Sequence, residues 1–428
     1  MQVTVLTVGS QGDVRPYVAL GKGLKSHGYG VRLATHTAFE EMARSNGLEF
    51  APIGGNPLDI LNGPDGKAWL ESADNPLHFL KSTSAVAGGI LDKLSSQALE
   101  AARGSDILIY AMPLAVTGYS IAEGLSIPGI PAALYPLHPT RAFPSILTPS
   151  LPARLGALNW ASSYIVAELF WHMVKSHHDR WRRQRLGIGP MPFLAPFSRH
   201  QKQGIPYLYG YSPSVIPRPP RWHATRVVCG YWFLDRPEDW RPPRDLSDFL
   251  EDGSPPLYVG FGSMLSADRE RLTRIVLEAL KRTGQRAVLS SGWGGLSGTD
   301  RSKDVFAIES VPHDWLFPRI AAAVHHGGVG TTAAALRAGI PSIVVPFFAD
   351  QFYWGKRVCA MGVGPAPLPE KKITAAGLSA AISRTLESEQ MRGDCRSLAR
   401  RIESEKGPET AAGALDLYVR GMKRGMTR

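Results

Sequence analysis

The chain carries two successive series of alternating strand and helix patterns, and each series opens with a buried strand that ends in a glycine turn. The first opens with "QVTVLTVGSQGD" (2–13) and the second with "PLYVGFGSM" (256–264). Between them, residues 213–256 are rich in proline and poor in apolar periodicity, as linkers are. Strands that alternate with helices form βαβ units around a parallel sheet. The pattern therefore predicts two α/β domains, which suits a chain of 428 residues.

The individual strands can be placed from their β-branched and apolar runs. The expected strands are 2–8, 29–35, 49–54, 106–112 and 130–137 in the first half, and 256–264, 286–295, 305–311, 321–328 and 340–348 in the second. A further short strand is possible at 226–233, inside the proline-rich stretch. Ligands of open α/β sheets bind outside the carboxyl ends of the strands. A binding cleft is therefore expected where the two sheets face each other.

Charge and cysteine content limit the function only loosely. The formal net charge is +11, and the densest basic cluster is "HHDRWRRQR" (177–185). A basic surface suits a phosphate-bearing substrate, an anionic membrane or nucleic acid, and a solvated, slightly basic surface explains it equally well. The three cysteines are far apart and form no C-x-x-C pair, which fits a reducing compartment and disfavours a disulfide framework or a zinc site.

The chain shows no pattern of a signal peptide, because it opens directly on a strand. Its most membrane-like stretch, 158–174, is short and carries Glu168, so a buried or interfacial helix is expected there rather than a membrane span. The sequence predicts a cytoplasmic protein with peripheral membrane association as an option.

The turn after the strand at 321–325 has the composition of an anion-binding site. It contains His326, Gly327, Gly328, Gly330, Thr331 and Thr332, just before an alanine-rich helix. Glycines let the main chain approach a ligand, and the first N–H groups of a helix together with its dipole favour an anion such as pyrophosphate. The ring of His326 and the threonine hydroxyls are expected to add donors. A plain tight turn explains a single loop of this kind equally well, and the absence of G-x-x-x-x-G-K disfavours a P-loop ATPase.

Two further features support a ligand site in the second half. The strand at 256–264 ends in Gly260, Gly262 and Ser263, and adjacent strands would bring this turn beside the first one. Asp350 and Gln351 follow the strand at 340–348, where a carboxylate and an amide can bind vicinal hydroxyls. Asp350 can equally be the N-cap of the next helix, which would leave the Gln351 side chain free.

The first half ends its first strand with "GSQGDVRP" (9–16), in which Gly9 and Gly12 allow a tight loop. Asp13 stands next to the helix start, and by spacing alone an N-cap is the simpler interpretation. The functional interpretation is a general base that faces the cleft. No G-x-G-x-x-G fingerprint is present, and no acid closes the second strand.

Several blocks of the chain resemble one family. They are "GSQGDVRPYVALGKGLKSHGYGVRLATH" (9–36), "FAPIGGNP" (50–57), "PTRAFP" (139–144), "RWRRQRLG" (180–187) and "VPHDWLFPRIAAAVHHGGVGTTAAALRAGIPSIVVPFFADQFYWGKRV" (311–358). The chain resembles the GT-B glycosyltransferases that use nucleotide sugars, above all the sterol glucosyltransferases and the bacterial transferases of antibiotic aglycones. The likeness covers most of the chain and is weakest over about 58–130 and 145–210.

The resemblance implies an α/β chain with the GT-B fold, in which two Rossmann-like parallel-sheet domains face each other across a cleft. It divides the chain into an acceptor domain (1–217), a linker (218–245), a nucleotide-sugar domain (246–405) and a C-terminal helix that packs back on the first domain (406–428). It also implies an inverting transferase that moves a hexose, most simply glucose from UDP-glucose, to a hydroxyl of a sterol, terpenoid or polyketide.

The resemblance also implies a role for each matching residue. The donor side would comprise Gly262, Ser263, His313, His326, Gly328, Gly330, Thr331 and Thr332 near the pyrophosphate, and Asp350 and Gln351 at the sugar hydroxyls. Asp13 would be the general base, as in the antibiotic transferases. The plant relatives use a histidine backed by an acid after a later strand, but here that strand (106–112) offers no acid beyond Asp106. A lone carboxylate base is therefore expected.

Two departures leave the nucleotide open. Ser310 stands near the place of the plant family's base-stacking tryptophan, so Trp293 is a candidate platform for the base, with a core or lid role as its alternative. Ala334 or a neighbour replaces the acid that binds ribose, so both UDP and dTDP donors remain possible. No D-x-D motif occurs, and no metal or other cofactor is expected to be required.

The acceptor side is expected in the first half, where aromatic residues suit a large apolar molecule. The candidates are Gly12, His138, Phe143, Trp160 and Phe170, with Trp171 beside them. Core packing is the alternative for any single aromatic residue. For the whole protein, the alternatives are a dTDP-deoxysugar transferase, a non-catalytic protein that binds sugar nucleotides or lipids, and a nucleic-acid binder suggested by charge alone.

Overall fold

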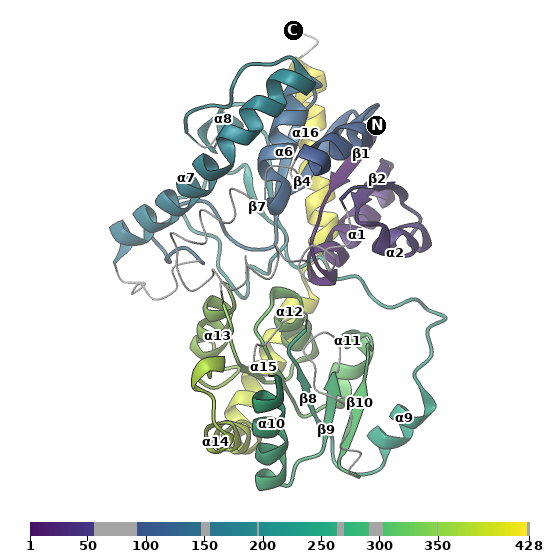
Figure 1. The fold of residues 1–428 in the computed structure, drawn as a ribbon, viewed down its shortest axis with the longest axis vertical. Helices are drawn as coiled ribbons and strands as arrows, with labels where there is room; N and C mark the ends of the chain where they lie inside the picture. The colour runs from purple at the N-terminus through teal and green to yellow at the C-terminus, as the bar shows by residue number, and fades with distance from the viewer. Residues whose placement is uncertain are drawn as a thin grey trace. The chain divides into compact units, whose positions relative to one another are not determined.

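The computed structural model describes residues 1–54, 92–146, 155–194, 197–262, 269–290, 303–348 and 350–425. The chain forms two compact units, one of Met1–Leu234 with Lys406–Arg428 and one of Asp235–Glu405. Each unit is a parallel sheet with helices, as predicted (Figure 1).

The first unit contains a seven-stranded parallel sheet in the order β3-β2-β1-β4-β5-β6-β7. The strands are β1 Gln2–Leu6, β2 Gly30–Thr35, β3 Glu49–Pro52, β4 Ile107–Ala111, β5 Gly129–Ala133, β6 Tyr207–Tyr209 and β7 Arg226–Val228. The first five strands match the sequence prediction, whereas β6 was missed. The short strand considered at 226–233 is present as β7, which pairs with β6, so this part of the predicted linker (218–245) belongs to the sheet.

The helices of the first unit pack around this sheet. They are α1 Gln11–Ser26, α2 Glu40–Ser45, α6 Ala115–Gly124, α7 Gly156–Trp181, α8 Phe197–Lys202 and α16 Gly407–Gly425, with short turns η1 Thr37–Phe39, η3 Met112–Leu114 and the π-helical η4 Arg182–Leu186. Residues 92–102 are also helical. Helix α7 is longer than the stretch 158–174 suggested. Among the described residues, no helix combines the length and the apolar character needed to cross a membrane.

Helix α16 lies against α1, so the predicted return of the C-terminal helix to the first domain is confirmed. Its carboxylate at Asp416 accepts hydrogen bonds from Tyr29 Oη at 2.7 Å and contacts His27 Nδ1 at 2.8 Å. A β-carbon at Gly23 of α1 would overlap Pro408, so glycine permits this close approach.

The second unit contains a five-stranded parallel sheet in the order β10-β9-β8-β11-β12. Its strands are β8 Leu257–Gly260, β9 Ala287–Ser290, β10 Val305–Ile308, β11 Ala322–His325 and β12 Ser342–Val344. Its helices are α9 Arg244–Glu251, α10 Arg269–Thr283, α11 His313–Leu316, α12 Val329–Ala338, α13 Gln351–Ala360, α14 Ala375–Glu387 and α15 Glu389–Glu403, with turns η5 Phe317–Arg319 and η6 Glu370–Lys372.

Both faces of the second sheet are buried, because successive residues of one strand pack into different cores. Leu257 and Val259 of β8 join the core that includes α10 and α14, whereas Tyr258 joins the core with Trp315 and Phe317. In each unit the strand order reverses beside the first strand, at β1/β4 and at β8/β11. Such a reversal is where open α/β sheets bind their ligands.

Candidate active site

The two glycine turns of the second unit lie side by side at the β8/β11 reversal. Gly260, the last residue of β8, pairs with His325, the last residue of β11. The turns that follow these strands therefore leave the sheet at the same edge. The prediction that adjacent strands bring both turns together is confirmed.

The imidazole of His326 fills the space between the turns. A β-carbon on Gly262 would lie 2.9 Å from its Cε1, and a β-carbon on Gly328 would overlap its Nε2. Its Nδ1 is buried and has no hydrogen-bond partner among the residues that the structure describes. Burial lowers the pKa of His326 to about 4, although a hydrogen bond with the backbone of Gly260 acts in the opposite direction. The ring is therefore neutral near pH 7 and has an unused nitrogen.

Helix α12 starts directly beyond this ring, with Gly328 as its N-cap. The N–H groups of Val329, Gly330 and Thr331 open the helix, where a helix has no internal acceptor for them. These N–H groups and the helix dipole favour an anion. Thr332 differs from the prediction: it is fully buried and its hydroxyl donates to the carbonyl of Gly328 at 2.9 Å, so it closes the first turn and is not a side-chain donor to a ligand.

His325 holds the backbone of this turn, a role that was not predicted from the sequence. It is fully buried, and its Nδ1 accepts a hydrogen bond from Gly327 N at 3.1 Å. Burial, with smaller contributions from His326 and His313, lowers its pKa to about 3. The adjacent histidines in the sequence were the available signal, because a ring nitrogen at the end of a strand can accept a hydrogen bond from the backbone of the turn that follows.

The position of His313 is set by ring packing. This residue begins α11, and its ring stacks on Phe317 with centroids 4.3 Å apart and contacts Tyr258 edge-on. Two other predicted donor residues, Ser263 and Trp293, lie outside the described residues.

Asp350 is the N-cap of α13, as the sequence analysis allowed, and its Oδ2 accepts from Trp354 Nε1 at 3.1 Å. The side chain of Gln351 is not free, contrary to the expectation. It is buried, and its Oε1 accepts from the backbone N–H of Phe347 at 2.8 Å and of Phe348 at 3.2 Å. Gln351 thus holds the loop after β12, and its oxygen is already in use.

In the first unit, Asp13 lies at the β1/β4 reversal, at the third position of α1. Its Oδ2 accepts from Ser10 N at 2.8 Å and from Ser10 Oγ at 2.9 Å, and Ser10 is the N-cap. The interpretation of Asp13 as the N-cap itself is therefore wrong by three residues. Burial raises the pKa of Asp13 above its ordinary value, while the hydrogen bonds from Ser10 oppose this change. A higher pKa makes the carboxylate a stronger base.

His36 supports the Asp13 loop and was not recognised from the sequence. It follows β2, is buried, and its Nε2 accepts from Gly9 N at 3.1 Å. Gly9 has φ +129°, and a β-carbon there would lie 2.5 Å from Asp13 Oδ2. The loop can therefore pass this closely beneath the carboxylate only with glycine at this position.

The predicted acceptor residues are dispersed within the first unit. Gly12 is in the first turn of α1, beside Asp13. His138 is buried against Tyr207 and Trp222, with its Nδ1 2.5 Å from Tyr209 Oη, and burial places its pKa well below 6.5. The remaining three are Phe143, which is half-buried, Trp160, which is exposed, and Phe170, whose side chain is outside the described part. Core packing, the alternative, holds for Trp171 but not for Trp160.

Two family models match the chain. Residues 3–144 match the glycosyltransferase family 28 N-terminal domain, and residues 299–416 match the C-terminal domain of erythromycin biosynthesis protein CIII-like. The two matches lie in the two halves that the repeated strand and helix patterns define.

Curated relatives include the sterol 3-beta-glucosyltransferases of Aspergillus clavatus and Emericella nidulans, each 38% identical over 427 residues and 97% of this chain. The chain spans only 29% and 30% of the length of these two proteins.

Solved structures with the same fold include the glycotransferase of kitacinnamycin, with a TM-score of 0.69 and 17% identity over 97% of this chain and 98% of that one. The calicheamicin glycosyltransferase CalG4 gives a TM-score of 0.67 and 19% identity over 98% of each chain. At such identities the likeness concerns the fold.

Proposed function

Because this chain belongs to the glycosyltransferases of the GT-B fold, we propose that it transfers glucose from UDP-glucose to a hydroxyl of a sterol or a similarly large apolar aglycone, with inversion at the anomeric carbon. The observation that carries the proposal is the His326 ring, held with an unused nitrogen between two glycine turns at the start of α12. This arrangement suits the pyrophosphate of a nucleotide sugar.

The second unit would bind and activate the donor. The open N–H groups of Val329, Gly330 and Thr331 point away from the helix and would donate to the phosphate oxygens. His326 would add a donor from Nδ1 once the ring takes up a proton, because the single N–H of the neutral ring is used at the Gly260 backbone. Because these dipoles are fixed before the reaction, they stabilise the charge that develops on the departing diphosphate, which is usually the largest contribution to such catalysis. No metal or cofactor is needed in this scheme.

The first unit would activate the acceptor through Asp13. As the acceptor oxygen attacks the anomeric carbon and the bond to the diphosphate breaks, the carboxylate takes the hydroxyl proton. Burial raises the pKa of Asp13, which increases its strength as a base. Such general-base assistance contributes about 10²–10⁴-fold in rate.

The acceptor class is suggested by the names of the relatives and by the apolar residues of the first unit. The 38% identical relatives are sterol 3-beta-glucosyltransferases. A sterol resides in a membrane, so peripheral membrane association belongs to the proposal.

A dTDP-deoxysugar donor with an antibiotic aglycone is the second candidate. The match of residues 299–416 to an erythromycin biosynthesis domain supports it. So does Gln351, because an oxygen that already accepts two backbone N–H groups is less able to bind the hydroxyls of an intact hexose.

The test measures nucleotide release by the purified chain with UDP-glucose or dTDP-glucose, with and without a sterol. We expect sterol-dependent UDP release, and Asp13→Asn should lower kcat by about 10²–10⁴-fold with the affinity for UDP-glucose unchanged. Asn keeps an oxygen that can accept from Ser10 N, so the fold should persist.

Asp106→Asn is the matched control, since Asp106 accepts from Gln2 N at the amino ends of β1 and β4, away from Asp13 at the carboxyl end of β1. It should leave kcat as it is. Unchanged turnover in Asp13→Asn would remove Asp13 from the mechanism, and release with dTDP-glucose alone would select the second candidate.

A further inference from the structure

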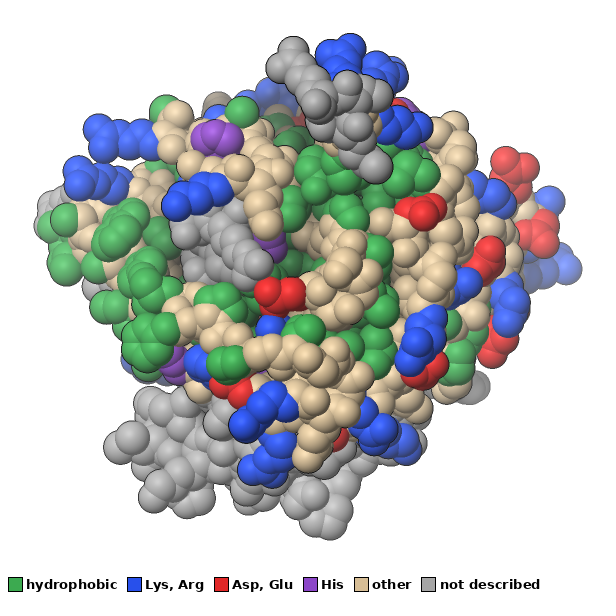
Figure 2. Space-filling model, turned by 90° about the horizontal axis from the view of Figure 1, so that it is seen from above, with side chains coloured by type: hydrophobic (Ala, Val, Ile, Leu, Met, Phe, Trp, Pro, Cys, Tyr) green, Lys and Arg blue, Asp and Glu red, His purple; other side chains and the backbone are tan. Residues whose placement is uncertain are grey.

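The outward face of α7 is apolar, which is the reverse of an ordinary surface helix. Leu158, Ile165 and Leu169 are 51%, 54% and 58% exposed. Their spacing of seven and four residues places them within about 40° of one another around the helix. Figure 2 shows hydrophobic side chains gathered at the left edge of the molecule, the side on which α7 begins in Figure 1.

The opposite face of α7 is fixed against the first unit, so the apolar face cannot simply turn inward. Asn159 and Ser163 are buried although they are polar, and Trp171 and Trp181 belong to the core of the unit. Trp171 packs edge-on against Tyr119 of α6 with centroids 5.9 Å apart. The helix therefore buries polar side chains while leucine and isoleucine stay exposed.

Residues 191–194 extend the apolar face. Phe193 is 75% exposed, the most exposed large hydrophobic residue among those described, and Leu194 beside it is also exposed. The Phe193 ring packs edge-on against His172 of α7 with centroids 5.0 Å apart. We define the α7 surface as Leu158, Ile165, Leu169, Phe193 and Leu194.

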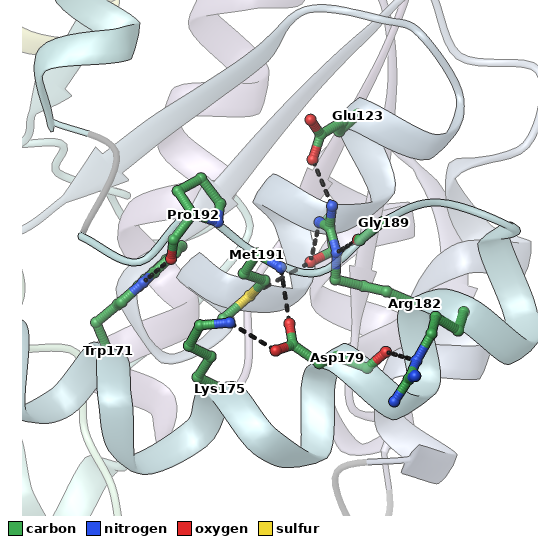
Figure 3. Close-up of polar contacts among 10 residues, drawn as sticks. Glu123, Trp171, Lys175, Asp179, Arg182, Gly189, Met191 and Pro192 are labelled. Carbon is green, nitrogen blue, oxygen red and sulfur yellow. Dashed lines mark hydrogen bonds and ion pairs between the residues drawn. The ribbon is translucent and has the colours of Figure 1, made fainter.

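Hydrogen bonds hold residues 189–192 on α7 (Figure 3). Asp179 Oδ1 accepts from Met191 N at 2.7 Å, and Trp171 Nε1 donates to the carbonyl of Pro192 at 3.0 Å. Buried Arg182 donates to the carbonyl of Gly189 at 2.9 Å and pairs with Glu123 at 2.6 Å. The exposure of Phe193 is therefore a property of an anchored segment.

Positive charge lies at both ends of the α7 surface. Arg180, Arg183 and Arg185 are exposed at and beyond the end of α7, and exposed Arg141 adjoins its start, where its carbonyl accepts from Asn159 Nδ2. The two acids of α7 offset this positive charge only in part. Asp179 pairs with Lys175 at 2.6 Å, and half-buried Glu168 lies near His172.

We propose that the α7 surface docks on an anionic lipid bilayer, with its apolar side chains at the acyl boundary and the flanking arginines among the headgroups. Apolar area combined with cations is the chemistry of interfacial binding. A second copy of this chain fits less well, because parallel or antiparallel contact of two α7 helices would bring arginines onto arginines. The inference deepens the proposed function, since a sterol acceptor would be met at the membrane.

The test is co-sedimentation of the purified chain with vesicles of phosphatidylcholine, with or without phosphatidylglycerol. The triple variant carries Ile165→Ser, Leu169→Ser and Phe193→Ser. Its partition coefficient on anionic vesicles should be at least about tenfold lower than that of the parent chain. As a matched pair, Leu169→Ser should weaken binding, whereas Leu417→Ser, which alters a 71% exposed leucine of α16, should not.

The contribution of charge is tested separately with the double variant Arg183→Gln/Arg185→Gln. Its partition coefficient should fall about fivefold for each arginine removed, on anionic vesicles only. Arg400→Gln/Arg401→Gln, an exposed pair on α15, is the control. Equal vesicle binding of the triple variant and the parent chain would overturn the inference. So would self-association of the parent chain in analytical ultracentrifugation that the triple variant abolishes. The assay contains no sugar donor, so its failure is distinct from a failure of the proposed transfer.

Discussion

Donor binding should be linked to protonation of His326. Burial holds the pKa of this ring at about 4 in the free protein. A bound diphosphate would place negative charge beside the ring, and nearby opposite charge raises a histidine pKa. If binding restores the pKa to its ordinary value of about 6.5, the complex takes up a proton that the free protein does not hold. The association constant should then rise about tenfold between about pH 7.5 and pH 5.5.

The direction of this pH dependence follows from the linkage between proton binding and ligand binding. Because the pKa is higher in the complex than in the free protein, affinity increases as pH falls through the pKa of the complex, and it levels off below about 4, where the free ring also protonates. UDP-glucose is the suitable ligand, since it is a diester of pyrophosphate whose two ionisable groups are strongly acidic and do not titrate in this range.

Isothermal titration calorimetry at several pH values, in buffers of different ionisation enthalpy, measures both the affinity and the protons taken up. His326→Asn should abolish the pH dependence, whereas the exposed His223→Asn should retain it. An affinity that is flat or falls as pH decreases, or a pH dependence that survives in His326→Asn, would show that the diphosphate lies elsewhere.

Two further predictions concern packing. Gly328→Ala adds a β-carbon that overlaps the His326 ring, so the affinity for UDP-glucose, measured by calorimetry, should fall about tenfold. Gly393→Ala is the control, because a β-carbon there meets nothing within 4 Å. It should leave binding intact and stabilise its helix by about 0.5–1 kcal/mol. Arg182→Met should lower the free energy of unfolding by about 3 kcal/mol in urea titrations, because it removes the donor to the Gly189 carbonyl, to Ser120 Oγ and to Glu123 at once. Glu123→Gln should cost less, because glutamine keeps an oxygen that can accept from Arg182; similar costs would contradict this account.

The strands that could be found from the sequence are those with long apolar runs between glycine turns. Strand β6 was missed because Tyr207–Tyr209 is only three residues long and lies between Pro206 and Gly210. Strand β7 was expected only as an option, because it lies within a proline-rich stretch whose composition indicates a linker. In both places the neighbouring strand supplies the hydrogen bonds that form the strand, and periodicity within so short a segment carries little of that information.

The site was predictable where main-chain geometry demands particular residues. The glycines around His326 are of this kind, because any β-carbon on Gly328 would overlap the ring. The roles of Thr332 and Gln351 were not predictable, since they depend on which backbone groups lie within reach of the side chain. His36 is a similar case: it meets Gly9 only because β1 and β2 are adjacent in the sheet.

Two tryptophans of α7 show why periodicity alone could not separate core from surface. Trp160 and Trp171 are eleven residues apart, so they lie within about 20° of one another on the same face of the helix. Trp171 is 5% exposed, beneath Tyr119 and the segment anchored by Asp179, whereas Trp160 is 47% exposed and stacks only on the neighbouring Tyr164 among the ring contacts of the described residues. The helix rises about 16 Å between them. What differs is therefore which segments of the unit cover this side of the helix at each level along its axis. Trp160 stays exposed although Asn159 and Ser163 near it are buried, whereas Trp171, at nearly the same angle as Trp160, is covered. The angle of an apolar residue around the helix therefore does not by itself decide whether it is buried.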